Sequence, residues 1–200
     1  MSGDGKKRIG AKAVVGFSVL LGIALILMQA RHVIFPSVSR DEVLHGTSFS
    51  FSFNDWNWET GLSTTFQCDG DGHVRFDFHA GTYPVERDGH VSHVPYRRNA
   101  QFTASAAEVM ALRTALADNG YFELNDQYLN RDIQDGAQTS FVATVGEHRK
   151  AVRCSNEYPE GIVAIQRHVE RRLVRAHAAE IARAPIELRA GFPPPPADLH

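Results

Sequence analysis

The chain has 200 residues, a formal net charge of −2, and 22% charged residues. A balance this close to neutral gives no whole-chain reason to expect nucleic acid or another acidic polymer as a partner. Apart from an apolar N-terminal run and a proline-rich end, about 150 residues remain, which is enough for one domain with its own hydrophobic core.

The N-terminal run predicts a single transmembrane helix over residues 13–30. Residues Ala13–Met28 are uncharged, and a basic segment, residues 1–12, precedes them with Lys6, Lys7, Arg8 and Lys12. A spanning helix needs roughly 17–25 mostly apolar residues, and positive residues stay on the cytoplasmic side. We therefore expect a single-pass membrane protein with a cytoplasmic N-terminus. The C-terminal domain is expected to be extracytoplasmic, or periplasmic in a Gram-negative cell.

A cleaved signal peptide has the same order of basic and apolar regions. Cleavage requires small residues at positions −3 and −1, and the best position, after Ala30, places Met28 at −3. The run is also long for a signal peptide. We therefore favour an uncleaved signal anchor followed by a tether over residues 31–47, and the cleaved leader is the alternative.

Residues 48–184 are expected to form one α+β domain, whose first strand is predicted from alternation. Phe49, Phe51 and Phe53 alternate with serines, which is the period of a strand. If Asn54-Asp55 is a two-residue turn, Trp56 and Trp58 return opposite the phenylalanines. This interpretation places both tryptophans in an aromatic core. The alternative is an exposed stacking platform for sugars or peptides.

A second hairpin follows at residues 64–79. Thr64–Cys68 and a strand beginning at His73 flank Asp69-Gly70-Asp71-Gly72, which has the chemistry of a turn. The turn opens like a calcium loop, but His73 and Val74 break the EF-hand pattern. A plain hairpin turn is therefore favoured, and a short strand over Val91–Tyr96 is expected next.

The period then becomes helical. Ser105 and Glu108 form a capping-box pattern, and Asn119-Gly120 is a typical helix end. A polar loop, Asn125–Gly136, and a further β-hairpin over residues 138–154 follow.

Pro159 is expected to begin a long second helix that ends near Arg183. Its apolar stripe consists of Ile162, Ile165, Val169, Leu173 and Ala176. Residues 185–200 are proline-rich and are expected to be a flexible tail. The predicted fold is therefore an N-terminal transmembrane helix, then an antiparallel sheet of about four to six strands with two helices packed on one face.

Turn and core residues recur in a recognisable order across residues 62–175. They are Thr103…Glu108…Leu112, Gly120-Tyr121-Phe122, Tyr128, Asp135-Gly136, Val152-x-Cys154 and Pro159. This order resembles a bacterial α+β domain found in mostly uncharacterised secreted or membrane-anchored proteins. It is also similar to inhibitors of metalloproteases of the emfourin type. The resemblance implies a fold and adds protease inhibition as an alternative function.

Cys68 and Cys154 both fall on inward-facing positions of predicted strands. Outside the cytoplasm, an even number of cysteines suggests a disulfide. We predict a Cys68–Cys154 bridge, and two buried free thiols are the alternative.

Asp77 and His79 are the candidate metal ligands, because residues two apart on a strand share a face. A third ligand would come from His73, His90 or His93. Arg75 would repel a cation bound beside Asp77, so solvated histidines are the favoured interpretation. No metal and no other cofactor is predicted.

The polar loop carries Asp126, Asp132 and Asp135, which are candidate binding residues because loops on a rigid scaffold often carry function. No hydrolase elbow, zincin motif, P-loop or dinucleotide fingerprint occurs. We therefore predict a non-enzymatic, membrane-anchored extracytoplasmic domain that binds a protein partner or stabilises an envelope assembly. The alternatives are protease inhibition, an envelope enzyme, and a sugar-binding module that uses Trp56 and Trp58.

Overall fold

The computed structural model describes residues 38–57, 62–133 and 136–188. They form an α+β fold with one eight-stranded sheet, which confirms the predicted class. The sheet is larger than the predicted four to six strands. The transmembrane prediction over residues 13–30 lies outside the described residues. Among the described helices, none has the length and apolar character needed to cross a membrane.

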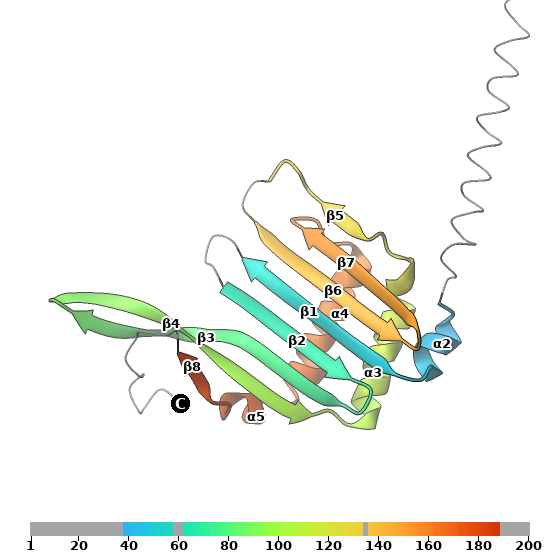
Figure 1. Cartoon of the computed structure of the whole chain (residues 1–200), viewed down its shortest axis with the longest axis horizontal. Coiled ribbons are helices and arrows are strands. Elements are labelled where there is room, and N and C mark those ends of the chain that lie inside the picture. Colours follow the sequence, from blue (N-terminus) through green and yellow to red (C-terminus); the bar gives the residue numbers. More distant parts are fainter. Residues whose placement is uncertain (1–37, 58–61, 134–135, 189–200) are drawn as a thin grey trace, which may run out of the picture. The chain divides into compact units, whose positions relative to one another are not determined.

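The strand order is β5-β7-β6-β1-β2-β3-β4-β8, so the first strand lies inside the sheet (Figure 1). The strands are β1 (Phe49–Asn57), β2 (Leu62–Asp69), β3 (His73–Arg87), β4 (His90–Thr103), β5 (Gln127–Leu129), β6 (Ala137–Val145), β7 (His148–Ser155) and β8 (Ile186–Leu188). β5 and β7 pair in parallel, which makes the sheet mixed and corrects the prediction of a purely antiparallel one. β5 lies within the predicted polar loop, so part of that loop forms the edge of the sheet beside β7.

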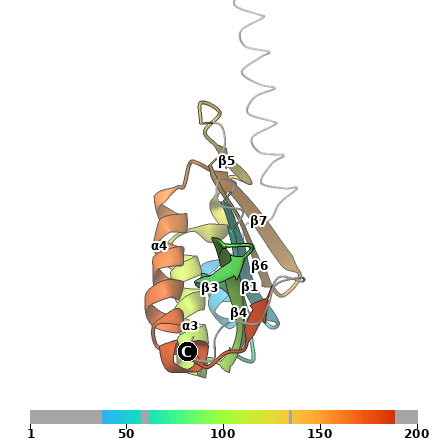
Figure 2. The same cartoon turned by 90° about the vertical axis from the view of Figure 1, so that its left-hand side faces the viewer.

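The helices lie on one face of the sheet, where α3 and α4 form the main layer (Figure 2). The helical segments are α2 (Arg40–His45), α3 (Ala106–Asp118), the 3₁₀ turn η1 (Tyr121–Glu123), α4 (Glu160–Val169), the π-helical turn η2 (Glu170–Val174) and α5 (Ala178–Ala182). α2 packs against α3, and α5 packs against β4.

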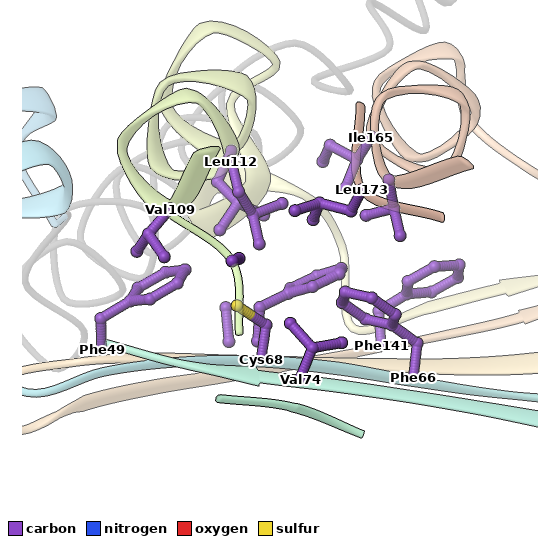
Figure 3. Packing of buried hydrophobic residues seen from close by; sticks show 14 of the residues in the cluster. Phe49, Phe66, Cys68, Val74, Val109, Leu112, Phe141, Ile165 and Leu173 are labelled. Carbon is purple, nitrogen blue, oxygen red and sulfur yellow. The ribbon is translucent and has the colours of Figure 1, made fainter. Parts of the chain in front are cut away.

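The core fills the space between the sheet and the two long helices (Figure 3). Phe66 and Phe141 project from the strands and are fully buried. Leu112 on α3 and Ile165 on α4 meet them from the helical layer. Burial of one such side chain contributes about 1.5–3 kcal/mol, so the many buried side chains of this layer make a large contribution to stability.

The predicted capping box begins α3. The backbone N–H of Ser105 donates to Glu108 Oε2 at 2.7 Å, and the Glu108 N–H donates to Ser105 Oγ at 3.3 Å. The helix ends before Gly120, whose φ of 57° lies in the left-handed region. Both ends of α3 therefore lie where its sequence predicts them.

The predicted turn at Asn54-Asp55 is wrong. β1 continues through both residues, and Asp55 pairs with Thr64 on β2 and Thr139 on β6. Asn-Asp lacks the glycine that favours a tight turn. Pairing on both sides of β1 outweighs this weak local signal.

The predicted long second helix is interrupted. At η2, the Arg175 N–H donates to the carbonyl of Glu170, five residues earlier, at 3.0 Å. This wider turn changes the helical register. As a result, Ala176 is exposed although it was expected in the buried stripe, and Ile181 on α5 is buried.

The folded domain extends beyond both of its predicted boundaries. The stretch predicted as a tether contains α2, where Ser39 Oγ caps the N-terminus and Val43 is 2% exposed. Arg113 on α3 holds this helix by donating to the carbonyl oxygens of Val43 and Gly46. The stretch predicted as a flexible tail begins with β8, which pairs with β4.

Candidate functional site

An open groove of about 890 Å³ lies between α3 and the α4–η2 segment. Ala107, Ala111 and Ala115 line it at four-residue intervals on α3, and Ala164 lines it on α4. Its polar and larger lining residues are Glu108, Met110, Thr114, Asp118, Asn119, His168, Arg171 and Arg172. The groove therefore combines a surface of small apolar side chains with charged rims.

The outer side of α3 is unusually apolar for a surface helix. Its inner side buries Val109, Leu112 and Leu116 in the core, and a surface helix normally carries polar residues on the other side. Here the alanines face the groove, and Met110 is 39% exposed. Exposed methionine suits adaptable binding surfaces.

One end of the groove is fixed by close contact between the helices. A Cβ atom added at Gly161, in the first turn of α4, would lie 2.8 Å from the carbonyl oxygen of Asn119. Glycine is therefore required for this approach. The Asn119 side chain in turn donates to the carbonyl of Ala115 at 2.7 Å, which secures the end of α3.

The groove arginines belong to the π-helical turn. Arg171 and Arg172 are the second and third residues of η2, and His168 lies one residue before the end of α4. Single π turns inside helices are rare, and those that do occur are often found at functional sites.

The acidic groups around the groove have partners within the chain. Asp118 pairs with Arg40, Glu170 pairs with Arg175 at 2.8 Å, and Glu108 lies 3.3 Å from His177 Nε2. In contrast, Arg171 and Arg172 form no ion pair with any residue in the described part of the chain. Arg171 and Arg172 are therefore the charged groups of the groove that lack an ion-pair partner among the described residues.

His168 contributes a partly buried imidazole ring to this surface. Burial lowers its pKa, and the nearby Arg172 guanidinium lowers it further. Its Nε2 atom is inaccessible and has no hydrogen-bond partner among the described residues. The positive charge of the groove therefore comes from its arginines.

The other face of the sheet carries no helix of the described residues (Figure 2). We call it the uncovered face. Its side chains on β1, β2 and β4 are mostly hydroxyls and amides: Ser50, Ser52, Asn54, Ser63, Thr65, Gln67, Asn99 and Gln101. A hollow of about 460 Å³ on this face is lined by several of them, together with Arg75.

Trp56 lies on the uncovered face and is 37% exposed, which corrects its predicted place in the core. In a strand without a turn, residues separated by an odd number point to opposite sides. Phe51 and Phe53 face the helices, so Trp56 faces away from them. Trp58 lies outside the described residues.

Asp77 and His79, the candidate metal ligands, are not grouped with a third potential ligand in the described part of the chain. Arg97 Nε and Nη2 donate to Asp77 Oδ1 at 2.8 and 2.6 Å, so an internal cation already occupies this carboxylate. Burial lowers the pKa of His79, and Arg97 lowers it further.

The described residues contain one group of three potential metal ligands, Asp69, Asp71 and His73. Asp69 Oδ1 accepts the N–H groups of Asp71 and His73 at 3.0 and 2.9 Å, and Asp69 Oδ2 lies 3.0 Å from His73 Nδ1. Desolvation raises the pKa of Asp69, but the hydrogen bonds from His73 outweigh it and the net pKa is lowered. These bonds are those of a hairpin turn.

The predicted disulfide is wrong, because Cys68 and Cys154 are both free and buried. Cys68 lies on β2 and Cys154 on β7, with β1 and β6 between them. Three strand spacings place them about 14 Å apart across the sheet, whereas a disulfide requires Cα atoms within about 7 Å. Both cysteines do face inward as predicted, but two residues on the same face of a sheet can be far apart.

The acidic loop residues are not gathered into a site. Asp126 pairs with Lys150 at 2.6 Å, and its carbonyl accepts the Arg153 N–H, so it attaches β5 to β7. Asp132 is exposed, and its N–H donates to Asn130 Oδ1. Asp135 lies outside the described residues.

No protein-family model and no curated protein matches the chain. The groove was missed from sequence, although the alanines at i, i+4 and i+8 of α3 and the Arg171-Arg172 pair were visible signals.

Proposed function

We propose that the chain is a non-catalytic binding domain, held at the outer side of a membrane, that docks an acidic segment of a protein partner between α3 and α4. The observation that carries this proposal is the alanine-lined groove whose arginines have no acidic partner in the described part of the chain. The membrane placement rests on the basic and then apolar N-terminal sequence.

The chemistry of the candidate nucleophiles supports a binding role. Burial raises the pKa of Cys68 to about 12 and that of Cys154 to about 11, so both thiols stay protonated near neutral pH. The hydroxyl of Ser105 donates to Glu108 Oε2 at 2.7 Å and forms no hydrogen bond with a histidine among the residues that the structure describes. Activation of a serine requires such a base within hydrogen-bond reach.

The groove suits a peptide or helix with closely spaced acidic and small apolar residues. Alanine side chains allow a backbone to approach closely, and guanidinium groups bind carboxylates through two parallel hydrogen bonds. An amphipathic helix laid in a groove is a common recognition mode. The occupant we propose is therefore an acidic amphipathic segment.

The test compares two charge-reversal variants of the full chain in its native membrane. R171E/R172E changes the groove, whereas R167E/R183E changes two exposed arginines that do not line it, with the same change in net charge. After chemical crosslinking, wild-type protein and the control should recover the same partner. The groove variant should recover it at least about tenfold less, because each reversal replaces an attraction with a repulsion.

The crosslinked peptide of the partner must also be acidic. Equal recovery by both variants, or a crosslink that maps away from α3 and α4, would contradict the proposal. If the partner is a metalloprotease that loses its activity when mixed one-to-one with this chain, the protein is an inhibitor. Turnover of a small molecule by the purified chain would overturn the non-catalytic assignment.

A further inference from the structure

The uncovered face carries a continuous array of hydrogen-bonding side chains. One row across the sheet is Ser52, Gln67, Arg75 and Gln101, and the adjacent row is Asn54, Thr65, Asp77 and Asn99. Neighbours in such a row have Cβ atoms about 4.5–5.5 Å apart. Hydroxyl and amide groups both donate and accept, so the array matches a ligand that does the same, although Asn99 Oδ1 is itself inaccessible.

This array has little net charge. Asp77 is neutralised by Arg97, whose Nη1 also donates to Ser63 Oγ at 2.7 Å, and Asp69 is bonded to His73. Arg75 forms no ion pair with any residue that the structure describes. On the same face, beyond β6, the exposed Arg149 and Arg153 of β7 add two more positive charges. Recognition of nucleic acid requires many uncompensated positive charges, and the array on β1–β4 supplies one.

Trp56 adds one aromatic surface at the end of β1. It is 37% exposed and is flanked by Ser63 on β2 and Gln138 on β6. A protein interface usually has a cluster of apolar and aromatic residues at its centre. A single tryptophan beside hydroxyls and amides does not resemble one.

The hollow of about 460 Å³ lies further along the same strands. Ser52 lines it, and four residues along β1 separate Ser52 from Trp56, which corresponds to about 13 Å. An extended chain of a few sugar units spans that length. It would place one ring on the tryptophan and another in the hollow.

We infer that the uncovered face binds an oligosaccharide that runs along β1 and β2 between Trp56 and the hollow. The C–H face of one sugar ring packs on the indole. Its hydroxyls exchange hydrogen bonds with the side chains of Ser52, Asn54 and Gln67. The guanidinium group of Arg75 donates to two neighbouring oxygens of the sugar. This site is separate from the helix groove and does not depend on its function.

The test applies the full chain to an array of immobilised microbial oligosaccharides. The chain is kept in lauryldimethylamine oxide micelles, because glycoside detergents would compete for the site. We expect retention on a defined subset of glycans. Trp56→Ala should weaken binding at least about tenfold through loss of stacking, and Trp56→Phe should restore much of it. Gln67→Leu should weaken binding without changing the unfolding midpoint.

The control for independence is R171E/R172E, which should bind the same glycans as the wild-type chain. Loss of glycan binding in that variant would overturn a separate site on the sheet. Failure to retain any oligosaccharide, or binding that Trp56→Ala and Gln67→Leu leave unchanged, would overturn the proposal. Neither result bears on partner docking in the groove, which the crosslinking yields test separately.

Discussion

The two faces of the sheet share the same strands but differ completely in chemistry. On β2, Phe66 is fully buried under the helices, while its neighbour Thr65 faces away and donates to Asn54 Oδ1 at 3.3 Å. The covered face must fill a close-packed space, so its residues are determined by volume. The uncovered face has no such constraint. Alternation with a period of two therefore builds the core and sorts the recognition chemistry at the same time.

The largest expected difference between the faces is in thiol reactivity. A rise in the pKa of Cys68 from 9.0 to about 12 lowers its thiolate fraction about 1,000-fold, and a rise to about 11 lowers that of Cys154 about 100-fold. In native protein, both should react with a thiol reagent far more slowly than a cysteine introduced by Thr65→Cys. Denatured, unreduced wild-type protein should take up two equivalents, and fewer than two would reveal a disulfide.

Side-chain truncations at neighbouring residues of β2 should lower the free energy of unfolding by different amounts on the two faces. Phe66→Ala removes a ring that contacts Phe51, Phe53 and Phe76, and we expect it to lower the free energy of unfolding by about 3–5 kcal/mol. Thr65→Ala should change it by less than about 1 kcal/mol. Denaturant titration of the full chain measures both, and similar losses would show that the two faces contribute equally.

Loss of the α3 cap should have a smaller effect. Ser105→Ala removes the side-chain acceptor of the capping box, and we expect a loss of about 1 kcal/mol. Ser105→Thr keeps the acceptor and should recover most of it. Ser50→Ala on the uncovered face should change the unfolding midpoint little. A Ser50→Ala loss as large as that of Ser105→Ala would contradict the assigned role of the cap.

The smallest effect is on acid stability. Hydrogen bonds from the Ser105 side chain and backbone hold the pKa of Glu108 below its ordinary value, and His177 adds to this. Because the folded-state pKa is the lower one, the stabilisation is complete above the unfolded pKa of about 4.3 and is lost as pH falls through the folded pKa. Glu108→Gln should therefore lose less stability than wild type on acidification below about pH 5. Asp69, whose net pKa is also lowered, should keep part of the acid dependence, and an unchanged curve would contradict the assignment.

Local signals in the sequence predicted local structure well. The alternation at Phe49–Phe53 and the capping box at Ser105 both lie within a few residues, and both were confirmed. The path of β1 was not predictable in the same way, because its partner β6 comes about 80 residues later. The π turn at Glu170–Val174 has no known local signature in these residues. It depends on how the buried side chains of α4 and α5 must align with the core.

The candidate site shows the same contrast between local signals in the sequence and contacts between distant residues. The alanines of α3 were visible in sequence, but the charge of the groove depends on distant pairs. Arg40 neutralises Asp118 across 78 residues, and His177 approaches Glu108 from the other end of the domain. Only these contacts reveal which acids have partners and which arginines have no ion pair among the described residues. The place of Trp56 similarly depended on whether Asn54-Asp55 formed a turn.

The interior position of β1 also constrains the order of folding. If the chain emerges from its N-terminus, β1 to β4 can pair in sequence as a meander before β6 exists. During that interval, the second edge of β1 exposes unpaired backbone groups, and α4 has not yet formed to complete the helical layer over the core. Such an intermediate invites association with another copy. The delay before β6 arrives is therefore the step at which a folding helper would protect this protein most.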